Sequence, residues 1–107
     1  MAEEVLIILT TWPELGQAHT VARTLLAERL AACANILPGI ESIYRWQGNV
    51  EMSAEVQMLL KTTIGRYPQL ESRIKELHPY DVPEIVSLRV TDGLPAYLRW
   101  VENSCNG

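Results

Sequence analysis

His78 and Cys33 are the side chains of this sequence best suited to bind a metal ion. An imidazole suits Cu(II), whereas a thiolate suits Cu(I). His78 precedes Pro79, where a helix must end, so it is alternatively a terminal residue that interacts with the helix dipole. Cys33 lies between an expected helix and an expected strand, and it is alternatively a small buried thiol. A single imidazole predicts only weak, unselective binding of a divalent metal.

Three further side chains, Lys61, Tyr80 and Glu84, are predicted to line a cleft for a small ligand. Lys61 lies on the polar side of an expected strand, where its ammonium group pairs either with an anion or with a carboxylate such as Glu84. Asp81 or Glu84 can also supply oxygen to a metal ion held by His78. We expect this cleft where two copies of the chain meet.

Nucleophilic catalysis has little support in the sequence. It contains no Gly-x-Ser-x-Gly elbow, no phosphate-binding glycine loop and no Cys-x-x-Cys motif. The Cys33 thiol could act as a nucleophile with His78 as its base, but nothing in the sequence shows that the two side chains come within hydrogen-bond distance. We therefore predict that the protein is not an enzyme.

The tripeptide Tyr44-Arg45-Trp46 has two interpretations. These residues line a ligand pocket between subunits, or they anchor a subunit interface. Because Trp, Tyr and Arg are the residues enriched in interface cores, we favour the anchor.

A long β-hairpin from Cys33 to Thr63 is expected to position most of these residues. Ile36–Trp46 is rich in β-branched and aromatic residues, and Gln47-Gly48-Asn49 predicts the turn. Pro38-Gly39 predicts a bulge or a bend in an edge strand. In the second arm only Leu59 breaks a strict alternation. The apolar side carries Val50, Met52, Ala54, Val56, Met58 and Leu60.

The hairpin is too long for the domain that carries it. An arm of about 14 residues spans roughly 46 Å, whereas a compact domain of this size is only about 34 Å across. The hairpin should therefore project beyond its own core. Its apolar side then needs a cover, and another copy of the chain is the economical one.

The remaining elements complete an α+β fold in one domain, residues 1–107. The expected elements are a buried strand at Val5–Leu9, a helix opening at Pro13 and Glu14, a helix from Tyr67 to Leu77, a strand at Glu84–Val90 with Val86, Leu88 and Val90 inward, and a short helix opening at Pro95. The order β-α-β-β-α-β predicts a ferredoxin-like four-stranded antiparallel sheet with both main helices on one face. Because the first strand is apolar on both sides, the opposite face also needs a cover.

Several blocks of the sequence match one known family in the same order. They are Leu30–Asn35 (LAACAN), Leu37–Gly39 (LPG), Ser42–Trp46 (SIYRW) with Gly48, Glu55–Val56, Leu60–Thr63 (LKTT), His78–Tyr80 (HPY) and Val82–Ile85 (VPEI). Through these blocks the chain resembles the CutA family of divalent-cation tolerance proteins. The resemblance runs from about Ile7 to Trp100, which is nearly the whole chain.

The resemblance implies a homotrimer of ferredoxin-like subunits, similar to PII-type signalling proteins, in which the hairpins embrace neighbouring subunits. It also implies tolerance to copper and other divalent metals, without an obligatory cofactor. The family's copper-binding pattern has a Cys at the end of the first strand and two adjacent His before Pro-Tyr. Here Thr10 and Leu77 occupy two of these positions, and only His78 remains. A non-catalytic signalling or scaffold trimer is therefore the alternative function.

Composition limits the partners and the cellular compartment that we expect for this protein. The formal net charge is −4 and no Lys/Arg cluster is present, so we expect no nucleic-acid partner. No run of 18 apolar residues predicts a membrane span, and the start Met-Ala-Glu-Glu does not resemble a secretory signal. Two cysteines make no disulfide framework, and Cys105 is expected to be mobile and incidental. We predict a cytoplasmic protein.

Overall fold

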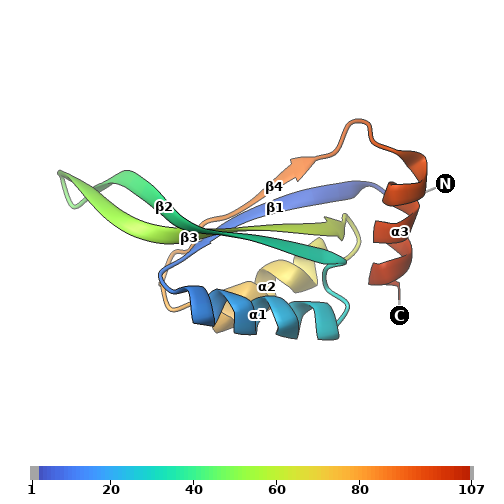
Figure 1. Ribbon diagram of the computed structural model, residues 1–107, viewed down its shortest axis with the longest axis horizontal. Helices are drawn as coiled ribbons and strands as arrows, with labels where there is room; N and C mark the ends of the chain where they lie inside the picture. The colour runs from blue at the N-terminus through green and yellow to red at the C-terminus, as the bar shows by residue number, and fades with distance from the viewer. Residues whose placement is uncertain (1–2, 107) are drawn as a thin grey trace.

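The structure, a computed structural model, describes residues 3–106. Along the chain the elements are β1 (Val5–Trp12), α1 (Leu15–Ala27), β2 (Cys33–Trp46), β3 (Asn49–Thr63), α2 (Tyr67–Leu77), β4 (Ile85–Arg89) and α3 (Pro95–Cys105). The strands form one antiparallel sheet in the order β2-β3-β1-β4 (Figure 1). This order confirms the predicted ferredoxin-like α+β fold.

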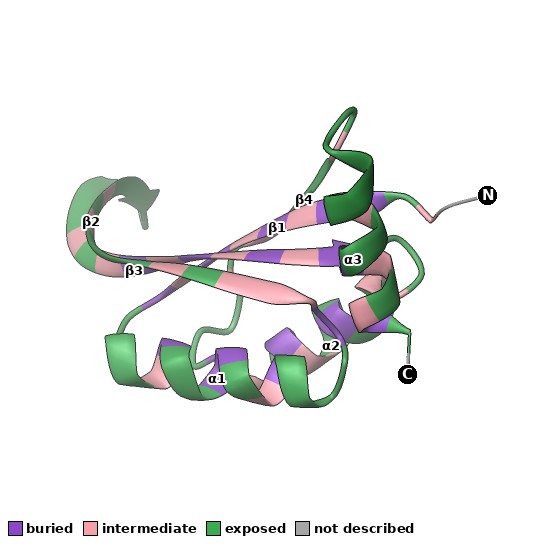
Figure 2. Cartoon of the chain, turned by 45° about the vertical axis from the view of Figure 1, so that its right-hand side comes forward, coloured by how far each residue is buried: buried purple, intermediate pink, exposed green. Residues whose placement is uncertain are grey.

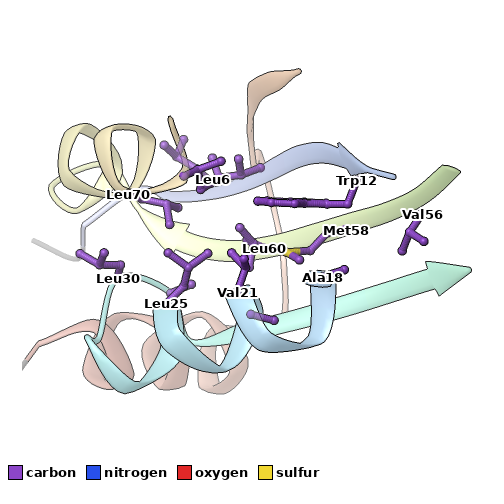
Figure 3. Packing of buried hydrophobic residues seen from close by; sticks show 14 residues of the cluster. Leu6, Trp12, Ala18, Val21, Leu25, Leu30, Val56, Met58, Leu60 and Leu70 are labelled. Atoms are coloured by element: carbon purple, nitrogen blue, oxygen red, sulfur yellow. The ribbon is translucent and has the colours of Figure 1, made fainter. Parts of the chain in front are cut away.

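The hydrophobic core lies between the sheet and the helices α1 and α2, which cover the same face (Figures 1 and 3). Every second residue of β1 faces these helices, so Leu6, Ile8 and Trp12 are buried. Leu25 of α1 and Ile74 of α2 close the core from the helix side. The helical spacing of apolar residues therefore decides which side of each helix is covered.

Helix α1 begins at Leu15, slightly later than the predicted start at Pro13 and Glu14. Glu14 has an extended backbone, with φ −135° and ψ 140°, and is the residue that precedes the first helical turn. Its carbonyl oxygen accepts the backbone N–H of Ala18. The segment before Leu15 is therefore a connection from β1 and not part of the helix.

The hairpin is as long as the sequence predicts. Gln47 and Gly48 form its two-residue turn, and both have positive φ, which is the conformation that matches the twist of the two strands. The β2–β3 register shifts between Leu37 and Ile40, which confirms that Pro38-Gly39 interrupts the strand. The molecule is 47 Å long but only 26 and 22 Å in its other dimensions, because the hairpin projects and curls away from the body (Figures 1 and 2).

The projecting part of the hairpin, residues 40–55, is here termed the distal arm. The apolar side of β3 runs from the body into this arm. Met58 and Leu60 of that side lie under the helices and are fully buried. Val50 and Met52, on the same side, are 68% and 65% exposed. The predicted alternation is therefore real, but one chain covers only half of it.

The face of the sheet opposite α1 and α2, here termed the helix-free face, is also apolar. Leu9 of β1 pairs with Leu59 of β3 and with Val86 of β4 on this face. Leu59 breaks the alternation because it belongs to this second apolar surface. The prediction that Val86 and Leu88 point inward was wrong, since they are 45% and 49% exposed. Ile85 takes the helix side of β4 and packs against the core.

Helix α3 crosses the end of the sheet near the start of β1 and the end of β3 (Figure 1). Its Val101 and Cys105 are fully buried. The expectation that Cys105 is mobile was wrong, because its carbonyl oxygen accepts a 2.8 Å hydrogen bond from Arg66 and its thiol lies 3.9 Å from the hydroxyl of Thr62. Burial raises the pKa of the Cys105 thiol. This cysteine is a core residue.

Candidate functional site

The main cleft lies between the distal arm and the segment that follows α2. It has a volume of about 750 Å³, within the range of pockets that hold small molecules. Its aromatic lining residues are Tyr44, Trp46 and Tyr80, and its carboxylates are Glu55, Asp81 and Glu84. The fold thus brings together two residues of the predicted ligand cleft, Tyr80 and Glu84, with the aromatic pair near the hairpin turn.

Tyr80 links the two walls of the cleft. Its hydroxyl donates a 3.0 Å hydrogen bond to Oε2 of Glu55 on β3. Burial, together with this bond and the charge of Glu55, raises the pKa of Tyr80 to about 12. Tyr80 therefore stays a neutral donor at physiological pH. Nearby, the hydroxyls of Tyr44 and Ser53 lie 2.7 Å apart and hold the Tyr44 side chain.

His78 does not line the cleft itself, but it contacts Tyr80, which does. Its Nδ1 accepts the backbone N–H of Tyr80 at 3.1 Å, and its Nε2 lies 2.6 Å from the carbonyl oxygen of Thr11. An imidazole that accepts at Nδ1 and donates at Nε2 is neutral. Burial lowers the pKa of His78, although the bond to Thr11 opposes this shift. The ring also packs against Trp12, with centroids 4.1 Å apart.

The predicted metal ligands do not converge. Both ring nitrogens of His78 are already engaged within the chain. Cys33 pairs with Lys61 across the β2–β3 ladder, and Lys61 in turn pairs with Ile7 of β1. Cys33 therefore lies level with the first half of β1. His78 instead bonds to Thr11, near the other end of β1. Within residues 3–106, no group of three or more His, Cys, Asp or Glu side chains could hold a metal ion.

Of the two other positions that the resemblance matches to copper ligands, one is buried and the other is partly buried. Thr10 is fully buried, and its hydroxyl has no hydrogen-bond partner in the structure. Leu77 packs against the hydrophobic core. Neither side chain offers a good metal ligand, so the residues present here do not form the copper pattern that the resemblance implies.

Lys61 does not line the cleft within one chain. Its ammonium group donates to the side-chain oxygen of Asn35. Along β3 it lies six residues from Glu55, a separation of about 20 Å at the usual rise per residue. Of the predicted ligand residues, only Tyr80 and Glu84 therefore lie together.

The predicted interface tripeptide is divided between two surfaces. Tyr44 and Trp46 line the cleft and are 41% and 59% exposed. Arg45 pairs with Val50 on the opposite side of the hairpin, as the strand alternation requires. Glu55 was missed as a site residue, because it follows the ordinary alternation of β3 and its partner Tyr80 lies 25 residues away in the sequence.

A family model described as CutA1 divalent ion tolerance protein matches residues 6–104. The chain belongs to this family. Among its CutA relatives, the divalent-cation tolerance protein CutA of Thermus thermophilus is 49% identical over 98 residues, which cover 92% of this chain and 95% of that protein. The protein of the same name from Citrobacter koseri is 45% identical over 101 residues, or 94% of this chain and 88% of that protein.

Solved CutA structures share the fold. The structure of the Thermus thermophilus protein superposes with a TM-score of 0.91 at 48% identity, covering 94% of this chain and 97% of that one. CutA1 from Oryza sativa gives a TM-score of 0.93 at 37% identity, covering 96% and 94%. A further CutA match, from Archaeoglobus fulgidus, is described as periplasmic. Among the helices described for this chain, none has the length and apolar character needed to cross a membrane.

Proposed function

We propose that this CutA-family chain acts in divalent-cation tolerance as a cytoplasmic homotrimer that is not an enzyme, with weak metal or small-ligand binding in clefts at subunit boundaries. Family membership supports the general role. The observation that carries the assembly is the exposed apolar surface: Ile43 and Met52 of the distal arm are 69% and 65% exposed, and Leu88 of the helix-free face is 49% exposed. Surfaces of this kind mark interaction sites.

The cleft around Tyr80 and Glu84 is a better candidate ligand site than His78 or Cys33. His78 is 7% exposed, and both its nitrogens have partners. Cys33 has a side-chain contact to Asn35 at 3.8 Å, and in the described part of the chain it belongs to no group of three or more His, Cys, Asp or Glu side chains that could hold a metal ion. Weak binding of copper or another divalent ion is therefore assigned to the carboxylates that line the cleft.

The same observations favour a second candidate function, a PII-like signalling or scaffold trimer that binds a protein partner. A site without three converging ligands gives a metal little selectivity. In this second function the exposed cleft and the distal arm contact the partner, and no metal is required.

Calorimetric titration with Cu(II) and Zn(II) separates the two functions. The metal function predicts weak saturable binding that Glu84→Gln reduces and that His78→Gln leaves in place. Tight binding that His78→Gln abolishes would contradict the assignment to the cleft. Absence of binding by the unaltered protein would favour the scaffold.

A further inference from the structure

We infer that the ligand of this cleft is a small organic cation, such as a quaternary or protonated amine. The inference rests on the proposed function, which takes the cleft as the ligand site. Its chemical class follows from the charges, the aromatic rings and the size of the cavity.

The charges that this chain contributes to the cleft favour a cationic ligand over an anionic one. Glu55, Asp81 and Glu84 line it, and no Lys, Arg or His belongs to the lining that the structure describes. The nearby Lys75 donates its ammonium hydrogen to the backbone carbonyl of Asp81 and is held there. A cavity walled by charges of one sign attracts counter-charges of the other.

The aromatic residues give the cleft a preference for organic cations. Tyr44, Trp46 and Tyr80 are all at least 39% exposed, yet all belong to one cavity. The hydroxyls of Tyr44 and Tyr80 are bonded to Ser53 and Glu55, so these rings are fixed before a ligand arrives. Cations are attracted to the faces of aromatic rings, and quaternary ammonium ligands are recognised by cages of such rings.

A bare metal ion fits the same cleft less well. One carboxylate oxygen of Glu55 already accepts the hydroxyl of Tyr80. Calcium takes six to eight oxygen ligands and magnesium demands an octahedral set, whereas no metal-holding group of three side chains occurs within residues 3–106. A volume of about 750 Å³ also suits a molecule better than an ion.

Choline and its uncharged isostere 3,3-dimethylbutan-1-ol test the charge requirement. The two probes have the same shape, so calorimetry on the unaltered protein measures the effect of the positive charge alone. We expect saturable choline binding and an affinity about tenfold or more weaker for the alcohol. Chemical-shift changes should concentrate at Tyr44, Trp46 and Tyr80.

A matched pair of variants tests the site. Glu55→Gln removes the charge that faces Tyr80 and should weaken choline binding about tenfold. Glu71→Gln is the control, because Glu71 accepts a 2.7 Å hydrogen bond from Tyr67 outside the cleft and reproduces the same Tyr–Glu pairing. This control should bind choline as the unaltered protein does.

Equal affinity for the two probes, no saturable choline binding, or equal losses in both variants would overturn the inference. The comparison of probes uses the unaltered protein, so it does not depend on the folding of any variant. Sedimentation and Cu(II) titration of the same sample test the proposed function separately. A trimer that binds copper through Glu84 but ignores choline would overturn the ligand class and leave the proposed function standing.

Discussion

His78 and Tyr80 are joined twice: the backbone N–H of Tyr80 donates to Nδ1 of His78 at 3.1 Å, and the two ring centroids lie 4.8 Å apart. The other ring nitrogen of His78 bonds to the carbonyl of Thr11. A neutral imidazole thus ties the segment after α2 to the end of β1, and it sets where Tyr80 enters the cleft.

Protonation of His78 should destabilise the protein in mild acid. Burial lowers the pKa of His78 below its ordinary value of 6.5. Between the lowered value and 6.5 the unfolded chain binds more protons than the folded one, so the free energy of unfolding rises with pH in this window and is flat above it. Denaturant unfolding from about pH 5 to about pH 8 measures this slope.

The variant His78→Gln should lose this part of the pH dependence. His19→Gln is the matched control, because His19 is exposed on α1. An unchanged slope in His78→Gln, or an equal change in His19→Gln, would show that His78 is not the titrating group.

Two tyrosines should ionise late in an alkaline titration. Burial first, and then a hydrogen bond to a carboxylate, raise the pKa of both Tyr67 and Tyr80 to about 12. Removal of the Glu55 charge by Glu55→Gln should lower the pKa of Tyr80, and Glu71→Gln should lower that of Tyr67, while burial keeps both above the ordinary value. Ultraviolet absorbance of phenolate measures both. A late phase that neither variant shortens would contradict the hydrogen bonds.

Neighbouring leucines on α1 should differ sharply in their contribution to stability. Leu25 is fully buried in the core, whereas Leu26 is 37% exposed. Leu25→Ala removes buried methyl groups and leaves a cavity, at a cost of about 2–5 kcal/mol in the free energy of unfolding. Leu26→Ala should cost less than about 1 kcal/mol. Equal costs in denaturant unfolding would show that the helix packs on a different side.

The helix-free face should govern assembly. Leu88→Gln introduces an amide where the account needs an apolar surface, so it should shift sedimentation towards smaller species. Leu26→Gln on α1 is the control, since its side of the helix lies away from the sheet. Equal assembly of the two variants would remove this face from the interface.

The fold was predictable from the sequence because its signals are local. The alternation of β3, the turn at Gln47-Gly48 and the proline that ends α2 each act within a few residues. Alternation also separates the two faces of a strand, but it does not say which face the helices cover. Val86 and Leu88 were therefore assigned to the wrong side of β4.

The cleft was only partly predictable, because it depends on the curl of the hairpin. Tyr80 and Glu84 lie close in sequence and share a loop, so they were found together. Glu55 lies 25 residues before Tyr80 in the sequence and reaches the cleft through its hydrogen bond to Tyr80. Lys61 is on the same strand as Glu55 but does not line the cleft. The sequence leaves His78 either as a metal ligand or as a helix-terminal residue, because it does not show that both ring nitrogens are already bonded.

Sedimentation equilibrium of the unaltered protein over a wide dilution range tests whether the chain folds only as part of a trimer. We predict a particle of three times the 12.1 kDa subunit mass, whose dissociation is accompanied by loss of structure. A folded 12.1 kDa monomer that melts cooperatively at high dilution would contradict it.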